Sequence, residues 1–128
     1  MSTLSAFNTQ LTNLSNNLSE SYPNDPDLQF SSTTINFLKS TNPRKLQEIF
    51  NKYIYIYKDE IMNQDENFLL NNDFINNTVN NDNVDYAISI MNNLKKYWND
   101  MDNESKDNIW KYFKVLVILN TKCIEESK

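Results

Sequence analysis

The chain has no glycine among its 128 residues. Glycine reaches left-handed backbone angles without a steric penalty and lets a backbone lie close to a bound phosphate. The absence of glycine excludes the glycine-rich phosphate loops of P-loop nucleoside triphosphatases and of dinucleotide-binding folds. Where a helix ends in a left-handed residue, we expect asparagine there, because asparagine is the next most tolerant residue.

Histidine is also absent. It is the usual general base near neutral pH and the commonest ligand of transition metals, so most familiar enzyme sites are excluded with it. The net charge of −5 disfavours nucleic acid and anionic membranes as partners, except through a local basic patch. We therefore expect a protein with no catalytic, cofactor-binding or metal-binding residues.

The composition is typical of one globular domain. Hydrophobic residues make up 39% of the chain, which is enough apolar surface for a single core over residues 1–128. Cys123 is the only cysteine and cannot form an intramolecular disulfide, as is typical of a reducing compartment. The N-terminus lacks the pattern of a signal peptide, and no apolar run is long enough to span a membrane. We predict a soluble protein that is not secreted and contacts no membrane.

Apolar residues recur at helical spacing near the N-terminus, which predicts a helix from about Thr3 to Glu20. Its inward-facing residues are Leu4, Phe7, Leu11, Leu14 and Leu18. The opposite face is rich in serine, threonine and asparagine, which are poor helix formers, so packing must stabilise this helix. Two interpretations of residues 1–22 stay open: a helix of the bundle, or a less tightly attached helix that docks on a partner.

Two prolines predict the starts of the next helices. Asp25 can cap a helix over Pro26 to Lys39, with the proline in the first helical position. Pro43 begins a third helix in the same way, with Thr41 or Asn42 as its cap. The apolar stripe of this third helix comprises Leu46, Ile49, Phe50 and Tyr53.

The rest of the chain predicts short helical turns, an asparagine-rich loop over Asn76 to Asn83 and two longer helices. The first of these covers Val84 to Asn99 and can be capped by Asp82. The final helix can be capped by Asp102 or Asn103, and it is apolar nearly all round, as expected of a helix in the middle of a bundle. The predicted fold class is all-α: a single-domain compact bundle of about five helices with a buried C-terminal helix.

Acidic residues form two clusters, at residues 59–66 and 100–107. The second opens like a calcium loop, Asp-X-Asp-X-Glu, but it lacks the glycine of such loops and has Lys111 where the bidentate glutamate belongs. Negative charge at the positive end of the final helix dipole is the simpler account. The first cluster is expected to be a solvated acidic loop.

Residues 39–58 combine positive charge with tyrosines, as single-strand nucleic-acid binders do. The candidate interaction surface comprises Arg44, Lys45, Lys52, Tyr55, Tyr57 and Lys58. Tyr53 continues the apolar stripe of the third helix and should lie in the core, whereas the alternation over Ile54 to Lys58 predicts an extended link. Whether the tyrosines of the candidate surface face outward stays open.

Three other conspicuous residues are expected to be buried. With no histidine to form a thiolate pair, Cys123 is interpreted as a structural thiol and not as a nucleophile. Trp98 and Trp110 are interpreted as core residues and not as a ligand cage.

A resemblance to a known family rests on three stretches in order: NPRKLQEIFNKYI, YKDEIMNQDENFLLNNDF and LKKYWNDMDNESKDNIWKYFKVLVIL. They resemble short, mostly uncharacterised proteins of large nucleocytoplasmic DNA viruses, the giant viruses and phycodnaviruses. In those proteins an acidic segment precedes a pair of helices that ends in IWKYFKxL. The resemblance covers about Asn42 to Leu119, and no catalytic residues come with it.

The resemblance and the exclusions together imply a non-enzymatic viral protein that acts through contacts with a viral or host protein. Its expected location is the virion or the viral factory in the host cytoplasm. The alternative is a nucleic-acid-associated factor that uses the basic and aromatic residues 39–58. The partner and the oligomeric state stay open.

Overall fold

The computed structural model describes residues 2–71 and 85–127. These residues form seven α-helices and two short 3₁₀ helices, so the all-helical class is confirmed. The number of helices exceeds the predicted five because the stretch after the third helix folds into two short helices of its own. The predicted loop over Asn76 to Asn83 and the predicted cap Asp82 lie outside the described residues.

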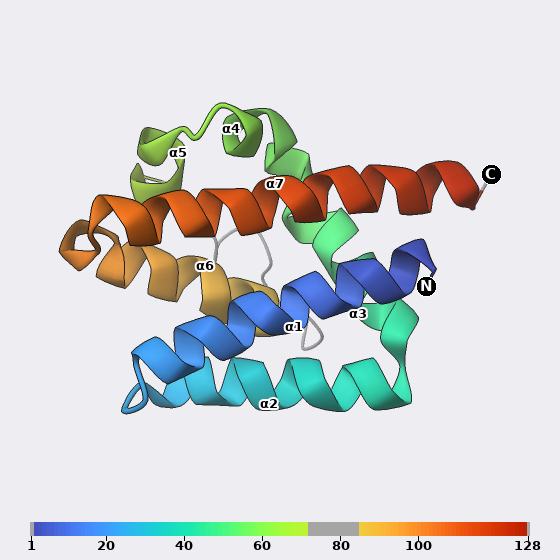
Figure 1. Ribbon diagram of the computed structural model, residues 1–128, viewed down its shortest axis with the longest axis horizontal. Coiled ribbons are helices and arrows are strands. Elements are labelled where there is room, and N and C mark those ends of the chain that lie inside the picture. The colour runs from blue at the N-terminus through green and yellow to red at the C-terminus, as the bar shows by residue number, and fades with distance from the viewer. Residues whose placement is uncertain (1, 72–84, 128) are drawn as a thin grey trace.

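The first two helices form a hairpin (Figure 1). α1 covers Thr3–Ser21 and α2 covers Pro26–Thr41, close to the predicted bounds. Asp25 caps α2 as predicted, because its Oδ1 accepts hydrogen bonds from the backbone amides of Asp27 and Leu28 at 2.9 and 3.2 Å. Pro26 occupies the first helical position, where a backbone N–H would have no partner within the helix. A proline, which lacks this N–H, therefore suits the start of α2.

In this structure α1 is part of the bundle. It lies between α2 and α7 and also contacts α3. The predicted apolar stripe is buried at four of its five positions, Phe7, Leu11, Leu14 and Leu18. The hydroxyl of Thr3 donates a hydrogen bond of 2.6 Å to Oε2 of Glu126, which holds the start of α1 beside the end of α7.

The chain stays helical after α3, which covers Pro43–Tyr53. η1 (Tyr55–Tyr57) and α4 (Lys58–Met62) follow directly, so the predicted extended link is wrong. The reason is burial, because Ile54 before η1 and Ile61 in α4 both enter the core.

The turn after α4 uses a glutamine in the left-handed conformation, where we expected asparagine. In the described part of the chain Gln64 is the residue with positive φ, at 54°. Its amide bonds to the carbonyl of Ile61 at 3.0 Å, and the amide of Asp65 bonds to the carbonyl of Glu60 at 2.9 Å, which is a Schellman motif. The Asp65 carboxylate then caps α5 (Glu66–Asn71) by accepting a backbone amide at 3.2 Å. One tight turn therefore orients α5 relative to α4.

The last third contains α6 (Asp85–Tyr97), η4 (Trp98–Asp100) and α7 (Asn103–Glu126). Of the two predicted caps, Asp102 is the one used, and its Oδ1 accepts the Ser105 amide at 2.8 Å. α6 packs against α2, and α7 packs against α1 and α4. Every α-helix contributes at least one side chain to the same core, so the described residues form one compact bundle.

The C-terminal helix is not buried on every side. Its inner face is buried as predicted, at Ile109, Trp110, Phe113, Leu116 and Val117. On the outer face, however, Val115 is 38% exposed and Ile118 is 47% exposed. The prediction of a fully buried helix is wrong for this face, because the helices that pack against α7, which are α1, α3 and α4, leave it uncovered (Figure 1).

Candidate functional site

The tyrosines of the candidate interaction surface turn inward. The hydroxyl of Tyr55 shares a hydrogen bond of 2.6 Å with Oγ1 of Thr121 on α7, and Nζ of Lys58 lies 4.9 Å from the centroid of its ring. The ring of Tyr57 packs against Phe68 with centroids 5.0 Å apart. Both tyrosines are half-buried and are used in contacts within the chain, which answers the question that the sequence left open.

The positive charges of the same surface stay accessible. On α3, Arg44 and Lys52 are exposed and Lys45 is half-buried. Tyr53, which we expected in the core, is half-buried at its edge, with Nζ of Lys52 5.3 Å from its ring centroid. The large side chain that faces solvent here is Ile56, which is 62% exposed.

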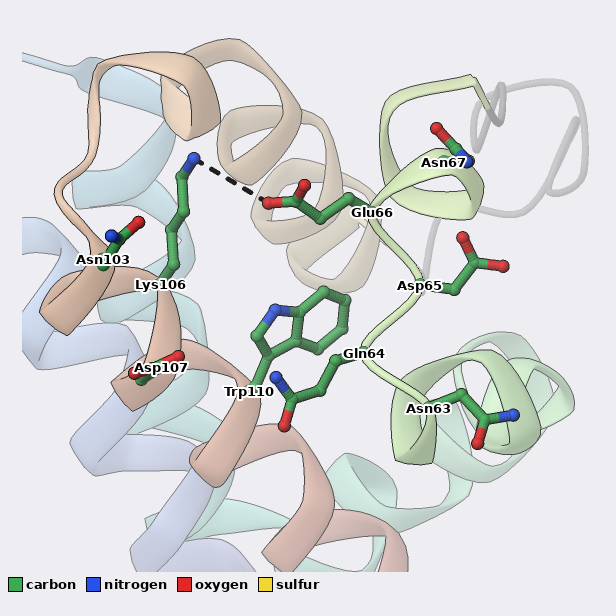
Figure 2. A pocket seen from close by; sticks show the side chains of 9 residues that line it. All are labelled: Asn63, Gln64, Asp65, Glu66, Asn67, Asn103, Lys106, Asp107 and Trp110. Carbon is green, nitrogen blue, oxygen red and sulfur yellow. Dashed lines mark ion pairs between the residues drawn. The ribbon is translucent and has the colours of Figure 1, made fainter.

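Three residues of the two acidic clusters line one open pocket of about 750 Å³ (Figure 2). Asp65 comes from the turn between α4 and α5, Glu66 is the first residue of α5, and Asp107 comes from the start of α7. The rest of the lining is formed by Asn63, Gln64, Asn67, Asn103, Lys106 and Trp110. The sequence did not indicate this arrangement, since it depends on the left-handed turn that places α5 beside the start of α7.

Glu66 connects the pocket to the core. Its Oε1 accepts a hydrogen bond of 2.7 Å from Nε1 of Trp98 and lies 3.8 Å from Nζ of Lys106. The rings of Trp98 and Trp110 meet edge to face with centroids 5.4 Å apart. Trp98 is fully buried and Trp110 is 5% exposed, which confirms that both belong to the core. Trp110 nevertheless borders the pocket with one edge.

A second polar cluster ties the hairpin turn to α6. The carboxylate of Asp25, which is 5% exposed, accepts hydrogen bonds from the hydroxyl of Tyr97 and, at 3.3 Å, from Nζ of Lys96. Burial raises the pKa of Asp25, but the hydrogen bonds donated to its carboxylate outweigh that effect and hold the pKa below 3.8. The ring of Tyr22 stacks on Tyr97 with centroids 4.0 Å apart. We interpret this cluster as structural, because its partners are all within the chain.

Cys123 is buried, 4% exposed, as predicted for a structural thiol. Burial raises the pKa of the thiol, and the nearby positive charge of Arg44 only partly offsets this increase. In the parts of the chain that the structure describes, no group of three or more His, Cys, Asp or Glu side chains is placed to hold a metal ion.

The outer stripe of α7, defined as Lys111, Val115, Ile118 and Lys122, is a surface that the sequence analysis missed. These four exposed residues follow one another at spacings of three and four, so they share one side of the helix. Beside the stripe, α1 and α7 border a groove of about 320 Å³, lined by Gln10, Asn17, Asn108, Lys111, Tyr112 and Val115. A signal was present in the sequence, since residues 108–124 contain three lysines and no acidic residue.

No protein-family model, curated protein or solved structure matches the chain. The resemblance to proteins of large DNA viruses therefore stays a prediction. None of the helices described in residues 2–71 and 85–127 is long and apolar enough to cross a membrane. The fold and its surfaces define an all-helical bundle with a polar pocket at one place and a cation-flanked apolar stripe at another.

Proposed function

We propose that the protein is a non-enzymatic binding protein that acts through protein–protein contacts, with the outer stripe of α7 as its contact surface. The observation that carries the proposal is the exposure of Val115 and Ile118 near the middle of a helix of 24 residues. Covering partly exposed aliphatic side chains contributes about 1 kcal/mol each to binding. A partner that covers both would gain this free energy.

The electrostatics of the stripe favour an acidic partner. The chain has a net charge of −5, yet residues 108–124 carry three lysines without an acidic residue. The neighbouring wall of the groove is neutral, because residues 3–19 of α1 contain no charged side chain. An acidic partner is therefore attracted to this groove and repelled by most of the remaining surface.

The partner that fits is an acidic amphipathic helix of another protein. Apolar residues at i and i+3 or i+4 of such a helix would cover Val115 and Ile118, in the helix-in-groove manner. Its carboxylates would pair with Lys111 and Lys122, while the amide side chains on the α1 wall can both donate and accept hydrogen bonds. The resemblance supports a viral or host protein as the partner, met in the virion or in the host cytoplasm.

A synthetic helical peptide tests this proposal directly. The probe carries leucines at i, i+4 and i+7 and glutamates on both sides of them, with a fluorophore for anisotropy. We expect saturable binding that weakens as salt rises, because exposed charge pairs are screened. The double substitution Val115→Ser with Ile118→Ser should weaken binding about tenfold or more.

The matched control is the double substitution Phe30→Ser with Phe37→Ser, which removes two exposed aromatic side chains from α2. This control should change the affinity by less than about twofold, as expected for residues outside the interface. The proposal is wrong if the acidic peptide shows no saturable binding below about 100 µM. It is also wrong if the α2 control loses as much affinity as the α7 variant.

A second candidate function is nucleic-acid association through the basic residues of the candidate interaction surface. The exposure of Arg44 and Lys52 on α3 favours contacts with phosphates. Base stacking is not favoured, because Tyr55 and Tyr57 pack against the chain itself. A gel-shift titration with single- and double-stranded DNA and RNA at two salt concentrations tests this candidate. The absence of salt-sensitive binding below about 50 µM would reject it.

A further inference from the structure

The open pocket between the α4–α5 turn and α7 has a negative charge. The lining contains three carboxylates, of Asp65, Glu66 and Asp107, and one ammonium group, of Lys106, which leaves a formal charge of −2. Most of the remaining lining consists of amide side chains, which can donate or accept hydrogen bonds. Charge alone does not make a binding site, but the pocket also presents a hydrogen-bond donor.

This donor is the indole nitrogen of Trp110. The side chain is 5% exposed, and its ring borders the pocket with Nε1 on the side of Glu66 and Lys106 (Figure 2). Among the described residues no acceptor lies within hydrogen-bond distance of this Nε1, whereas Nε1 of Trp98 is bonded to Glu66. A tryptophan that is largely buried normally finds a partner for its N–H. The Trp110 nitrogen is not enclosed but opens on the pocket, so its N–H is available to an acceptor that a ligand supplies.

We infer that this pocket binds a peptide segment that carries a basic side chain, with arginine as the best fit. A peptide carbonyl can accept the hydrogen bond of Trp110 Nε1, and the amide side chains of the wall can bond to the same backbone. The guanidinium group can pair with a carboxylate of the lining, such as that of Asp107. The inference goes beyond the proposed function, since the site lies on another side of α7 and takes a ligand of opposite charge.

A basic peptide supplies both a positive charge for the carboxylates and an acceptor for the indole N–H of Trp110. A free cation would be attracted to the carboxylates but would leave the indole N–H unpaired. A free anion could accept from Trp110 and Lys106, but three carboxylates would repel it. A peptide carries a carbonyl and a positive charge in one molecule, so the two interactions reinforce each other.

Solution NMR of the whole chain measures peptide binding at Trp110. The probe is acetyl-Gly-Arg-Gly-amide, and the signal is the indole N–H resonance of Trp110, which is assigned through the substitution Trp110→Phe. The matched peptide has citrulline in place of arginine, which keeps the shape and removes the charge. Guanidinium chloride and calcium chloride are titrated separately to identify the source of any cation effect.

We expect a saturable shift of the Trp110 indole resonance with the arginine peptide at about millimolar concentration, and a much smaller shift with the citrulline peptide. The substitution Asp107→Asn should weaken binding about threefold or more, whereas Asp27→Asn on the exposed start of α2 should leave it unchanged. The double substitution Val115→Ser with Ile118→Ser should also leave it unchanged, which separates this site from the outer stripe of α7.

Three results would overturn the inference. The first is no saturable shift of the Trp110 indole resonance up to about 10 mM peptide. The second is an equal shift with the citrulline peptide, which would show that charge plays no part. The third is an equal effect of guanidinium or calcium ions alone, which would show that the peptide backbone plays no part.

Discussion

The side-chain amide nitrogen of Gln47 on α3 donates a hydrogen bond of 2.6 Å to Oδ1 of Asn120 on α7. The amide nitrogen of Asn120 in turn donates to Oδ1 of Asn51 at 2.9 Å. Asn120 is fully buried and Gln47 is 7% exposed, so this amide ladder lies inside the bundle. It fixes how α3 and α7 pack, because a shift along either helix would leave buried amides unpaired.

Replacing Asn120 by leucine should destabilise the fold. The substitution Asn120→Leu keeps the branched shape but leaves the amide nitrogen of Gln47 buried without an acceptor, which costs about 1–3 kcal/mol. Urea unfolding followed by circular dichroism measures the change in the free energy of unfolding. The exposed Asn108 on the same helix provides the control, and Asn108→Leu should change the free energy by less than about 0.5 kcal/mol. Equal losses in both variants would contradict the importance of the ladder.

The stability that Asp25 contributes should depend on pH. Its pKa in the folded chain lies below 3.8, the ordinary value that unfolding restores. The contribution is therefore present above that value and is lost as the pH falls through the folded pKa. We expect Asp25→Asn to lower the free energy of unfolding by about 1–3 kcal/mol at neutral pH.

Unfolding curves of the wild type and the Asp25→Asn variant at a series of pH values test this expectation. The two curves should converge as the pH falls below 3.8. The exposed neighbour Asp27 is the control, and Asp27→Asn should show only a small effect at every pH. A difference between wild type and Asp25→Asn that stays constant into strong acid would rule out the carboxylate as its source.

Replacing Gln64, which has left-handed backbone angles, by glycine should stabilise the protein. A non-glycine residue in this conformation costs about 1 kcal/mol, part of which glycine recovers despite its greater freedom in the unfolded chain. We expect Gln64→Gly to raise the free energy of unfolding by about 0.5 kcal/mol, although it removes an exposed hydrogen bond from Lys114. The preceding Asn63 has ordinary right-handed angles, so Asn63→Gly should instead destabilise the protein by about 0.5–1 kcal/mol. Thermal unfolding of both variants measures these changes. A loss of stability in both would show that Gln64 is not strained.

The thiol of Cys123 should react slowly in the folded protein. Burial both blocks reagent access and raises the thiol pKa, so the reactive thiolate is scarce. Labelling with a chromogenic disulfide should be roughly a hundredfold or more slower than in urea, since it requires local opening of the end of α7. Similar rates in both solvents would show that the end of α7 is not packed as described.

The helix starts were predictable because their signals are local. Asp25 followed by proline, Pro43 and Asp102 each act within one helical turn, and a helix begins at each of them as predicted. The predicted side-chain cap of α3 is wrong, because Asn42 occupies the cap position without a side-chain hydrogen bond to the helix. The spacing of Phe7 to Leu18 likewise identified the buried face of α1, because that periodicity belongs to the helix itself. The candidate surface at residues 44–58 was less predictable, since the packing of α7 and α5 turned Tyr55 and Tyr57 inward.

By itself the sequence determined the all-helical class, the helix starts and the buried face of α1, for which local hydrogen bonding and periodicity suffice. Only the tertiary structure decided which face of α7 stays exposed, since this depends on how many helices pack around it. The structure alone also brought Asp65 and Glu66 beside Asp107 and Trp110. Contacts between residues so far apart arise from the angle of one turn, at Gln64, and from the side chains that fill the space between the helices.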